Sequence, residues 1–181
     1  MSVTLETPRL ILRQWRDADV EAWAEMSADP RVMEFFPELY DRARSEKTLA
    51  RMQTELERDG YGMWAVEIKQ TGRFAGVIGI EDIPYEMPFT PTREVGWRLA
   101  FDAWGHGYAT EGAKASLDFA FEKLGWDEVV AITAGINTRS QRVMERLGMI
   151  RDMSGDFDHP RIAVGHPLRP SVLYRIRRKR A

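Results

Sequence analysis

The sequence predicts an α/β protein of the α+β type, with a mixed, mostly antiparallel twisted sheet of about seven strands and about four helices. The first observation behind this prediction is a hairpin over 63–80, where two apolar runs flank the turn Gln70-Thr-Gly72. The second is a strand–helix–strand unit over 94–134, which predicts two parallel strands joined by a right-handed crossover. Hairpins combined with one such unit give a mixed sheet with helices packed on it.

Capping and helix-breaking residues set the bounds of the individual elements. Asp17 and Asp19 favour a helix start, because acidic side chains suit the positive end of a helix dipole, and Pro30 ends that helix. Gly60 and Gly125 stop two further helices. In chain order we expect a strand over 9–15, a helix between 17 and 30, a helix over 42–58, strands over 63–68, 74–80 and 94–100, a helix over 108–124, a strand over 128–133, a helix over 137–147, and late strands near 149–157 and 171–177.

Composition and length bound the classes of protein that the chain fits. Its 181 residues, 44% hydrophobic and 30% charged, suit one globular domain, which we expect to span 1–181. No apolar run reaches the roughly 18–20 residues of a membrane-spanning helix, and the N-terminus lacks a basic segment followed by an apolar stretch. We therefore expect no membrane partner, no signal peptide and a cytoplasmic location. The absence of cysteine excludes disulfides, thiolate nucleophiles and cysteine-based metal sites.

The charge balance argues against a protein built to bind nucleic acid. The net charge is −2 and the isoelectric point is about 6, whereas nucleic-acid binding draws its affinity from a strong basic excess. The basic segment 174–181 is interpreted as a last strand leading into a solvated tail, and an RNA contact is the less favoured alternative. His106, His159 and His166 lack the spacing of metal ligands, so no metal is expected.

The most informative segment is the glycine-rich loop Trp104-Gly-His-Gly-Tyr108, which lies between a predicted strand and a predicted helix. Its two glycines permit close approach of the backbone to a ligand, and the helix N-terminus offers unpaired N–H groups, so the loop predicts a pyrophosphate site. A P-loop is excluded because no Gly-Lys precedes Ser or Thr. A dinucleotide fingerprint is disfavoured because Thr110 stands where the third glycine is needed.

The same loop resembles the acetyl-CoA pyrophosphate loop of GNAT N-acetyltransferases, where Gln or Arg, two free positions, Gly, one free position and Gly or Ala precede a helix. Gly105 and Gly107 match this pattern, whereas Asp102 occupies the Gln/Arg position, so the backbone amides of 104–110 should matter more. The segment 137–149 resembles the family's later motif, whose Asn contacts the pantetheine arm. Asn137 also fits a helix cap, and the two roles are compatible.

The resemblance covers nearly the whole chain, because 7–13 and 94–111 are similar to the ribosomal-protein N-terminal acetyltransferase branch and 156–175 to uncharacterised bacterial members. It implies the GNAT fold, with an acetyl-CoA-binding core at about 93–149. It also implies transfer of an acetyl group from acetyl-CoA to a primary amine, either a protein N-terminal α-amine or a small-molecule amine, by direct attack in a ternary complex. The implied cofactor contacts are Leu99, Ala100, Trp104, Gly105, His106, Gly107, Tyr108, Ala109, Thr110, Asn137 and Ser140.

Catalysis by such a protein needs an oxyanion donor and a base. A backbone N–H of the strand over 94–100 would stabilise the thioester oxyanion, with Leu99 favoured by position and Ala100 next. Glu94 matches a glutamate that serves as base in histone-acetylating relatives, and an exposed strand-end carboxylate is the alternative. Glu81 is a second candidate, for which we prefer a solvated strand end. Met144 occupies the position of the family's tyrosine acid, so solvent is expected to supply that proton.

The acceptor pocket is expected between the first two helices and the late loops, where Phe35, Phe36 and Tyr40 are candidate lining residues, with simple core packing as the alternative. Tyr108 is a remote candidate acid better interpreted as helix packing. His159 and His166, which each precede a proline, are expected to shape their loops, and a position at the edge of the amine pocket is the less favoured alternative. A different class of function stays open, namely a non-catalytic acyl-CoA-binding sensor or interaction module. The quaternary state is expected to be a monomer or a homodimer.

Overall fold

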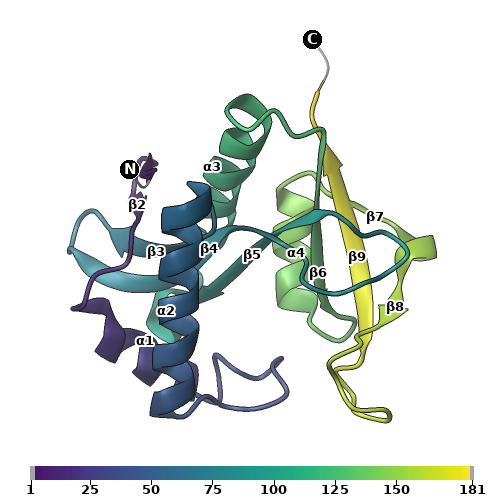
Figure 1. The fold of residues 1–181 in the computed structure, drawn as a ribbon, viewed down its shortest axis with the longest axis horizontal. Coiled ribbons are helices and arrows are strands. Elements are labelled where there is room, and N and C mark those ends of the chain that lie inside the picture. The colour runs from purple at the N-terminus through teal and green to yellow at the C-terminus, as the bar shows by residue number, and fades with distance from the viewer. Residues whose placement is uncertain (1–2, 180–181) are drawn as a thin grey trace.

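The computed structural model describes residues 3–179, and its centre is one twisted sheet with helices on both faces (Figure 1). The strand order is β1-β2-β3-β4-β5-β6-β9-β7, with β8 also paired to β9. The elements are β1 (Leu5–Glu6), β2 (Leu10–Arg13), α1 (Asp19–Ala28), α2 (Arg42–Asp59), β3 (Met63–Ile68), β4 (Arg73–Asp82), β5 (Arg93–Leu99), α3 (Tyr108–Glu122), β6 (Glu128–Ala134), α4 (Thr138–Arg146), β7 (Ile150–Arg151), β8 (Phe157–Asp158) and β9 (Pro170–Arg177).

The four predicted helices and the mixed sheet are confirmed, but the number of strands is nine rather than about seven. The strand expected near 149–157 is in fact two strands of two residues, β7 and β8, separated by a short 3-10 turn. Asp152 causes the interruption, because its side chain accepts a hydrogen bond from the Gly155 N–H at 3.2 Å. The additional strand β1 is too short to produce a periodic pattern, and it folds back with Leu5 opposite Leu12.

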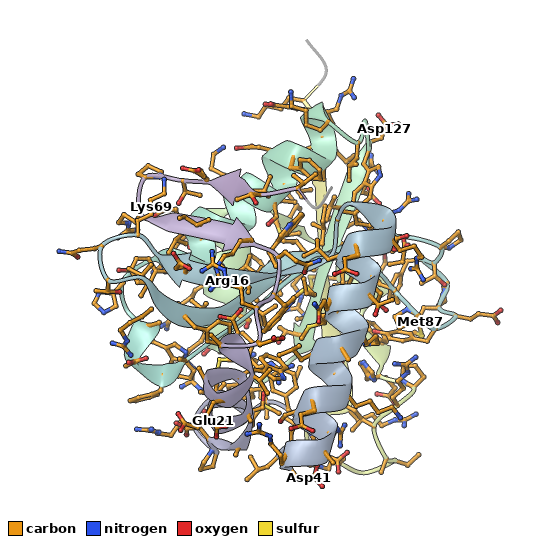
Figure 2. The ribbon with its side chains drawn as sticks, turned by 60° about the vertical axis from the view of Figure 1, so that its left-hand side comes forward. Arg16, Glu21, Asp41, Lys69, Met87 and Asp127 are labelled. Atoms are coloured by element: carbon orange, nitrogen blue, oxygen red, sulfur yellow. The ribbon has the colours of Figure 1, made fainter. Side chains whose placement is uncertain are left out.

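Capping chemistry explains where α2 begins and ends. Asp41 is its N-cap and accepts a hydrogen bond from the Arg44 N–H at 2.8 Å. Gly60 ends the helix in the left-handed conformation, with φ of 73°. Figure 2 shows Asp41 at one end of α2, which crosses in front of the sheet, and Met87 on the β4–β5 loop, which projects outward. This helix and loop border the sheet face that carries the residues discussed below.

One face of β4 and β5 is set by their antiparallel register. Glu81 lies opposite Glu94, Gly79 opposite Gly96, and Val77 opposite Arg98. Because side chains alternate along a strand, all these positions share one face. The Arg98 guanidinium lies over the ring of Trp23 on α1, so this is the face covered by α1 and α2. The opposite face packs on α3.

Strands β5 and β6 pair over a very short length. They are parallel, as predicted, but the only register pair is Glu94 with Val130. β6 instead pairs along its whole length with β9, from Glu128–Arg177 to Ala134–Ser171. The sheet therefore opens between β5 and β6 beyond their first residues, at the end where the glycine-rich loop follows β5.

The predicted last strand is confirmed as β9, and its cations are partly neutralised. Arg175 and Arg177 both pair with Glu128, at 2.7 Å and 2.8 Å. The end of the predicted basic tail, Arg180 and Ala181, lies outside the described residues. None of the helices within residues 3–179 combines the length and the apolar character that a membrane span requires.

Candidate active site

An open cavity of about 850 Å³ lies at the point where the sheet opens. Its walls are the last residues of β5, the loop that follows, the first turn of α3, one side of α4 and part of the segment between α1 and α2. Of the residues implied for cofactor binding, all except Ala100 line it. Phe35 and Phe36 line it as well, whereas Tyr40 does not.

The loop between β5 and α3 presents backbone donors to the cavity. Gly105 and Gly107 both have φ of 80°, a conformation that L side chains rarely adopt. Gly107 is the N-cap of α3 and has no side chain to engage the first helical N–H groups. These N–H groups belong to Tyr108, Ala109 and Thr110, which line the cavity, so an anionic ligand would meet unpaired donors and the positive end of a helix dipole.

Arg9 ties the start of β2 to this loop. Its Nη1 donates to the carbonyl oxygen of His106 at 2.9 Å, and its Nε donates to Glu111 at 2.6 Å. Burial works to raise the pKa of Glu111, but hydrogen bonds from Thr7 and Arg9 outweigh it and lower that pKa, so the carboxylate stays charged. Sequence reasoning missed this function of Arg9, although Arg9 and Glu111 both lie in segments that carry the family resemblance.

Asp102, the residue that departs from the GNAT loop pattern, is turned away from the cavity. It pairs with Arg73 at the start of β4, and both side chains are exposed. The cavity receives its cations from elsewhere, because Lys114 of α3 and three arginines of α4 line it. These groups can neutralise phosphates in place of the missing Gln or Arg; the arginines are Arg139, Arg142 and Arg146.

The end of β5 distinguishes between the two predicted oxyanion donors. The Ala100 N–H donates to the carbonyl oxygen of Ala75 at 2.9 Å and is therefore engaged. Because N–H groups alternate in direction along a strand, that of Leu99 points the other way, toward β6. No β6 residue pairs with this part of β5 in the described chain, since the pairing is limited to Glu94 and Val130. Leu99, not Ala100, therefore holds its N–H toward the cavity.

Asn137 caps α4 and keeps one acceptor position free. Its Oδ1 accepts from the Ser140 N–H at 3.2 Å, and its Nδ2 donates to Thr133 Oγ1 at 2.9 Å and Ser140 Oγ at 3.1 Å. An amide oxygen can accept two hydrogen bonds, so Oδ1 has room for an N–H of a bound ligand. The capping function is thus present, and it leaves the predicted cofactor contact possible.

Glu81 and Glu94 face each other across β4 and β5 without lining the cavity. The Glu81 side chain is 28% exposed and lies 3.5 Å from Arg51, which corrects the expectation of a solvated strand end. Burial, followed by the neighbouring charge of Glu81, raises the pKa of Glu94 to about 8. Burial also raises the pKa of Glu81. Burial therefore raises the pKa of both carboxylates, which lie opposite each other in the sheet.

The remaining predicted residues have structural surroundings. Met144 is buried, with 1% of its surface exposed, so its position offers no acid. His159 and His166 each accept a backbone N–H two residues later, at 3.2 Å, which fits the expected loop function. His106 is exposed and stacks on Tyr108 with ring centroids 5.3 Å apart. Among the described residues, no group of histidine, cysteine or acidic side chains could hold a metal ion.

Comparison with known proteins decides the family. Residues 9–150 match the family model described as an acetyltransferase (GNAT) domain. The chain belongs to the GNAT acetyltransferase family. It is therefore an acetyl-CoA-dependent acyltransferase.

Two similar proteins illustrate the range of the family. The chain is 32% identical over 146 residues to the uncharacterised protein YkkB of Bacillus subtilis, covering 80% of this chain and 84% of that protein. It is 32% identical over 155 residues to FsC-acetyl coenzyme A-N(2)-transacetylase of Aspergillus fumigatus, covering 81% of this chain and 64% of that enzyme.

Solved structures confirm the GNAT fold. An acetyltransferase from Agrobacterium tumefaciens has a TM-score of 0.78 at 30% identity, with 98% of this chain and 96% of that chain covered. The ribosomal L7/L12 α-N-protein acetyltransferase RimL, solved with coenzyme A, has a TM-score of 0.77 at 16% identity, with 97% and 98% covered. The RimL likeness concerns the fold alone.

Gly107→Ala is expected to weaken acetyl-CoA binding by roughly 5- to 30-fold, because a left-handed conformation costs an L residue about 1–2 kcal/mol and the loop must shift to avoid it. Titration calorimetry with acetyl-CoA measures this directly. Gly72→Ala is the matched control, since Gly72 also has a positive φ, 66°, and lies in the β3–β4 turn with nothing within 4 Å of an added Cβ. An unchanged Kd for Gly107→Ala would contradict the function assigned to the loop.

Proposed function

We propose that the protein transfers an acetyl group from acetyl-CoA to a primary amine by direct attack within a ternary complex. The observation that carries this proposal is the junction at the end of β5, where the outward-facing N–H of Leu99 and the donor-rich loop at 105–110 border one cavity. Acetyl-CoA carries a thioester at one end and a pyrophosphate farther along the molecule. The Leu99 N–H would serve the thioester, and the N–H groups of the loop would serve the pyrophosphate.

The residues divide the binding of acetyl-CoA between them. The backbone amides after Gly107 and the arginines of α4 would hold the phosphates, and Asn137 with Ser140 would hold the pantetheine arm. Both substrates bound side by side give the rate advantage of proximity. The Leu99 N–H would donate to the thioester oxygen as negative charge develops on it.

Proton transfer completes the reaction. A free amine is mostly protonated at neutral pH and must lose a proton before its nitrogen can attack the thioester carbon. The C–N bond forms, the C–S bond breaks, the nitrogen releases its second proton to solvent, and the thiolate takes a proton from solvent. Leu99 lies five positions after Glu94, about 16 Å along a strand, so we propose that Glu94 accepts the amine proton through a chain of water molecules.

The acceptor amine is either a protein N-terminal α-amine or a small-molecule amine. RimL is named for the first class, and the transacetylase of Aspergillus fumigatus for a coenzyme A-dependent N-acetylation. We propose further that residues 1–181 act as one acetyltransferase domain, whose cofactor-binding core lies at about 93–149, because the cavity draws on residues from Arg9 to Arg146.

Acetyl-CoA at about 100 times its Kd is expected to stabilise the protein by roughly 2.7 kcal/mol, which raises the melting temperature by about 5–11 °C. Thermal unfolding with acetyl-CoA, with NAD and ATP as controls, measures this. Turnover is then followed with a panel of amines. Stabilisation without turnover of any amine would favour the acyl-CoA-binding module instead, and no stabilisation would contradict both.

A further inference from the structure

Arg98 is a cation beside the acceptor side of the cavity, and neither the fold nor the proposed chemistry explains its charge. It lies on β5 directly before Leu99, lines the cavity, and projects on the sheet face covered by α1 and α2. It is only partly exposed. The phosphate-binding loop follows the other end of Leu99, so Arg98 faces the side from which an acceptor would approach.

The guanidinium of Arg98 lacks an anionic partner. Its Nε is buried and has no hydrogen-bond partner among the described residues. Its Nη1 has only the weak acceptor Met33 Sδ at 3.3 Å. None of the ion pairs formed within residues 3–179 includes Arg98. Burial lowers the pKa of Arg98, and Tyr40 opposes this effect more strongly than Glu81, which pairs with Arg51 instead.

Aromatic rings hold this guanidinium in place. Its Cζ lies 4.7 Å from the ring centroid of Trp23, 4.5 Å from that of Phe36 and 5.1 Å from that of Tyr40. The faces of such rings favour a cation but do not accept the hydrogen bonds of its edge, and the neutral hydroxyl of Tyr40 leaves the charge without an anionic partner. Buried charges in folded proteins are normally paired, because an unpaired one is costly. Three rings and a free hydrogen-bonding edge therefore describe a preorganised site for an anion that arrives with a ligand.

The position of Arg98 on β5 limits which kind of anion can pair with it. Glu94, Gly96 and Arg98 follow one another on the same face, and Gly96 leaves the strand between the two charged residues without a side chain. An amine that approaches the Leu99 N–H from this face lies close to Arg98, so an anion on the acceptor must sit within a few bonds of its nitrogen. An α-amino acid meets that condition, whereas the N-terminus of a protein lacks the carboxylate.

We propose that Arg98 binds the carboxylate of the acceptor, and thereby selects free amino acids over amides and peptide N-termini. The proposal rests on the acetyl transfer proposed above. The guanidinium offers two parallel N–H groups to the carboxylate, while the α-amine faces the thioester carbon. Arg98 thus determines specificity by positioning the acceptor, and it takes no part in the proton transfer.

The test compares each standard L-amino acid with its carboxamide as acetyl acceptor. A hydrogen-bonded charge pair predicts that kcat/KM for the wild-type protein favours the carboxylate by about tenfold to a hundredfold. In Arg98→Met that ratio is expected to fall to about one, and Arg98→Lys should restore part of it. The ratio does not depend on the fraction of active protein, so a loss of folded protein in a variant leaves the comparison intact.

Arg93→Met is the matched control, because Arg93 also lies on β5 and over an aromatic ring, that of Trp126, but pairs with Asp82 and does not line the cavity. It should keep the wild-type ratio. In parallel, melting temperatures are measured with coenzyme A plus each N-acetyl-amino acid or its carboxamide, which reports selection without turnover.

Equal use of acids and amides by the wild-type protein, or a preference that survives Arg98→Met, would overturn the proposal. So would a loss confined to acetyl-CoA affinity in Arg98→Met, since Arg98 would then bind a cofactor phosphate. If neither member of any pair is acetylated or bound, the proposal also fails. The shift in melting temperature with acetyl-CoA alone tests the proposed acetyl-CoA binding independently of these outcomes.

Discussion

Glu94→Gln is expected to lower kcat by about 100-fold or more, while the Kd of acetyl-CoA changes by less than about twofold. Glutamine keeps the size and one carbonyl oxygen of glutamate but cannot accept a proton from the amine. Glu94 does not line the cofactor cavity, so the cofactor should bind as before. Steady-state kinetics and calorimetry on the same preparations measure the two quantities.

The pH dependence of the rate gives a second measurement for the same residue. Glu94 must be unprotonated to act as a base, and burial together with Glu81 raises its pKa to about 8. The rate is therefore expected to rise with pH up to about 8 in the wild-type protein. The slope arising from this group should be absent in Glu94→Gln.

The free energy of unfolding should fall with pH over the range in which the rate rises. The pKa of Glu94 is raised from 4.5 to about 8 in the folded state, so between these values the folded state binds more protons than the unfolded one. The free energy of unfolding therefore falls as pH rises through that window, and Glu94→Gln should lose part of this decline.

Glu86→Gln is the control, since Glu86 is an exposed glutamate on the nearby β4–β5 loop. A kcat for Glu94→Gln within about threefold of the wild type would remove Glu94 from the mechanism. Glu81 would then be the group to test.

Local signals were sufficient to predict the loop and the two helix starts that border the cavity. The two glycines, the helix start after them and the Asn137 cap each depend on neighbouring residues, and the structure has all three in the expected places. Leu99 could be ranked above Ala100 by position alone, but the reason needs the register of β4 and β5, which engages the Ala100 N–H.

The acceptor side depended on contacts that the sequence does not reveal. A tight turn sets the register of β3 and β4. The loop between β4 and β5 is long, so the sequence does not define their register or the pairing of Glu81 with Glu94. That pairing follows only from the strand ends in the structure, Asp82 and Arg93. The surroundings of Arg98 combine α1 with the segment before α2, which has no periodic pattern. Local residue patterns do not predict such contacts between segments that are far apart in the sequence.

Gly79→Ala is expected to lower the free energy of unfolding by about 3 kcal/mol. A Cβ at Gly79 would lie 1.9 Å from the carbonyl oxygen of Gly62 and 2.7 Å from the Cα of Met63. Both are backbone atoms, so no side-chain rotation relieves the overlap and β3 must move away from β4. That movement also weakens the hydrogen bond from the Ile80 N–H to the Gly62 oxygen, now 3.2 Å long. The melting temperature should fall by about 6–12 °C.

Gly96→Ala is the matched control for this change, because Gly96 is the register partner of Gly79 on β5. Its added Cβ would meet Met63 Cε at 3.6 Å, an ordinary contact, so the free energy of unfolding should change by less than about 1 kcal/mol. Equal melting temperatures for the two variants would contradict the close approach of β3 and β4. The difference matters for function as well, since Gly79 cannot carry a side chain and Gly96 can. Packing thus requires glycine at Gly79 on β4, whereas the fold would tolerate alanine at Gly96, which lies between Glu94 and Arg98 on β5. A loss of amine acetylation in a stable Gly96→Ala protein would therefore locate the acceptor beside Gly96.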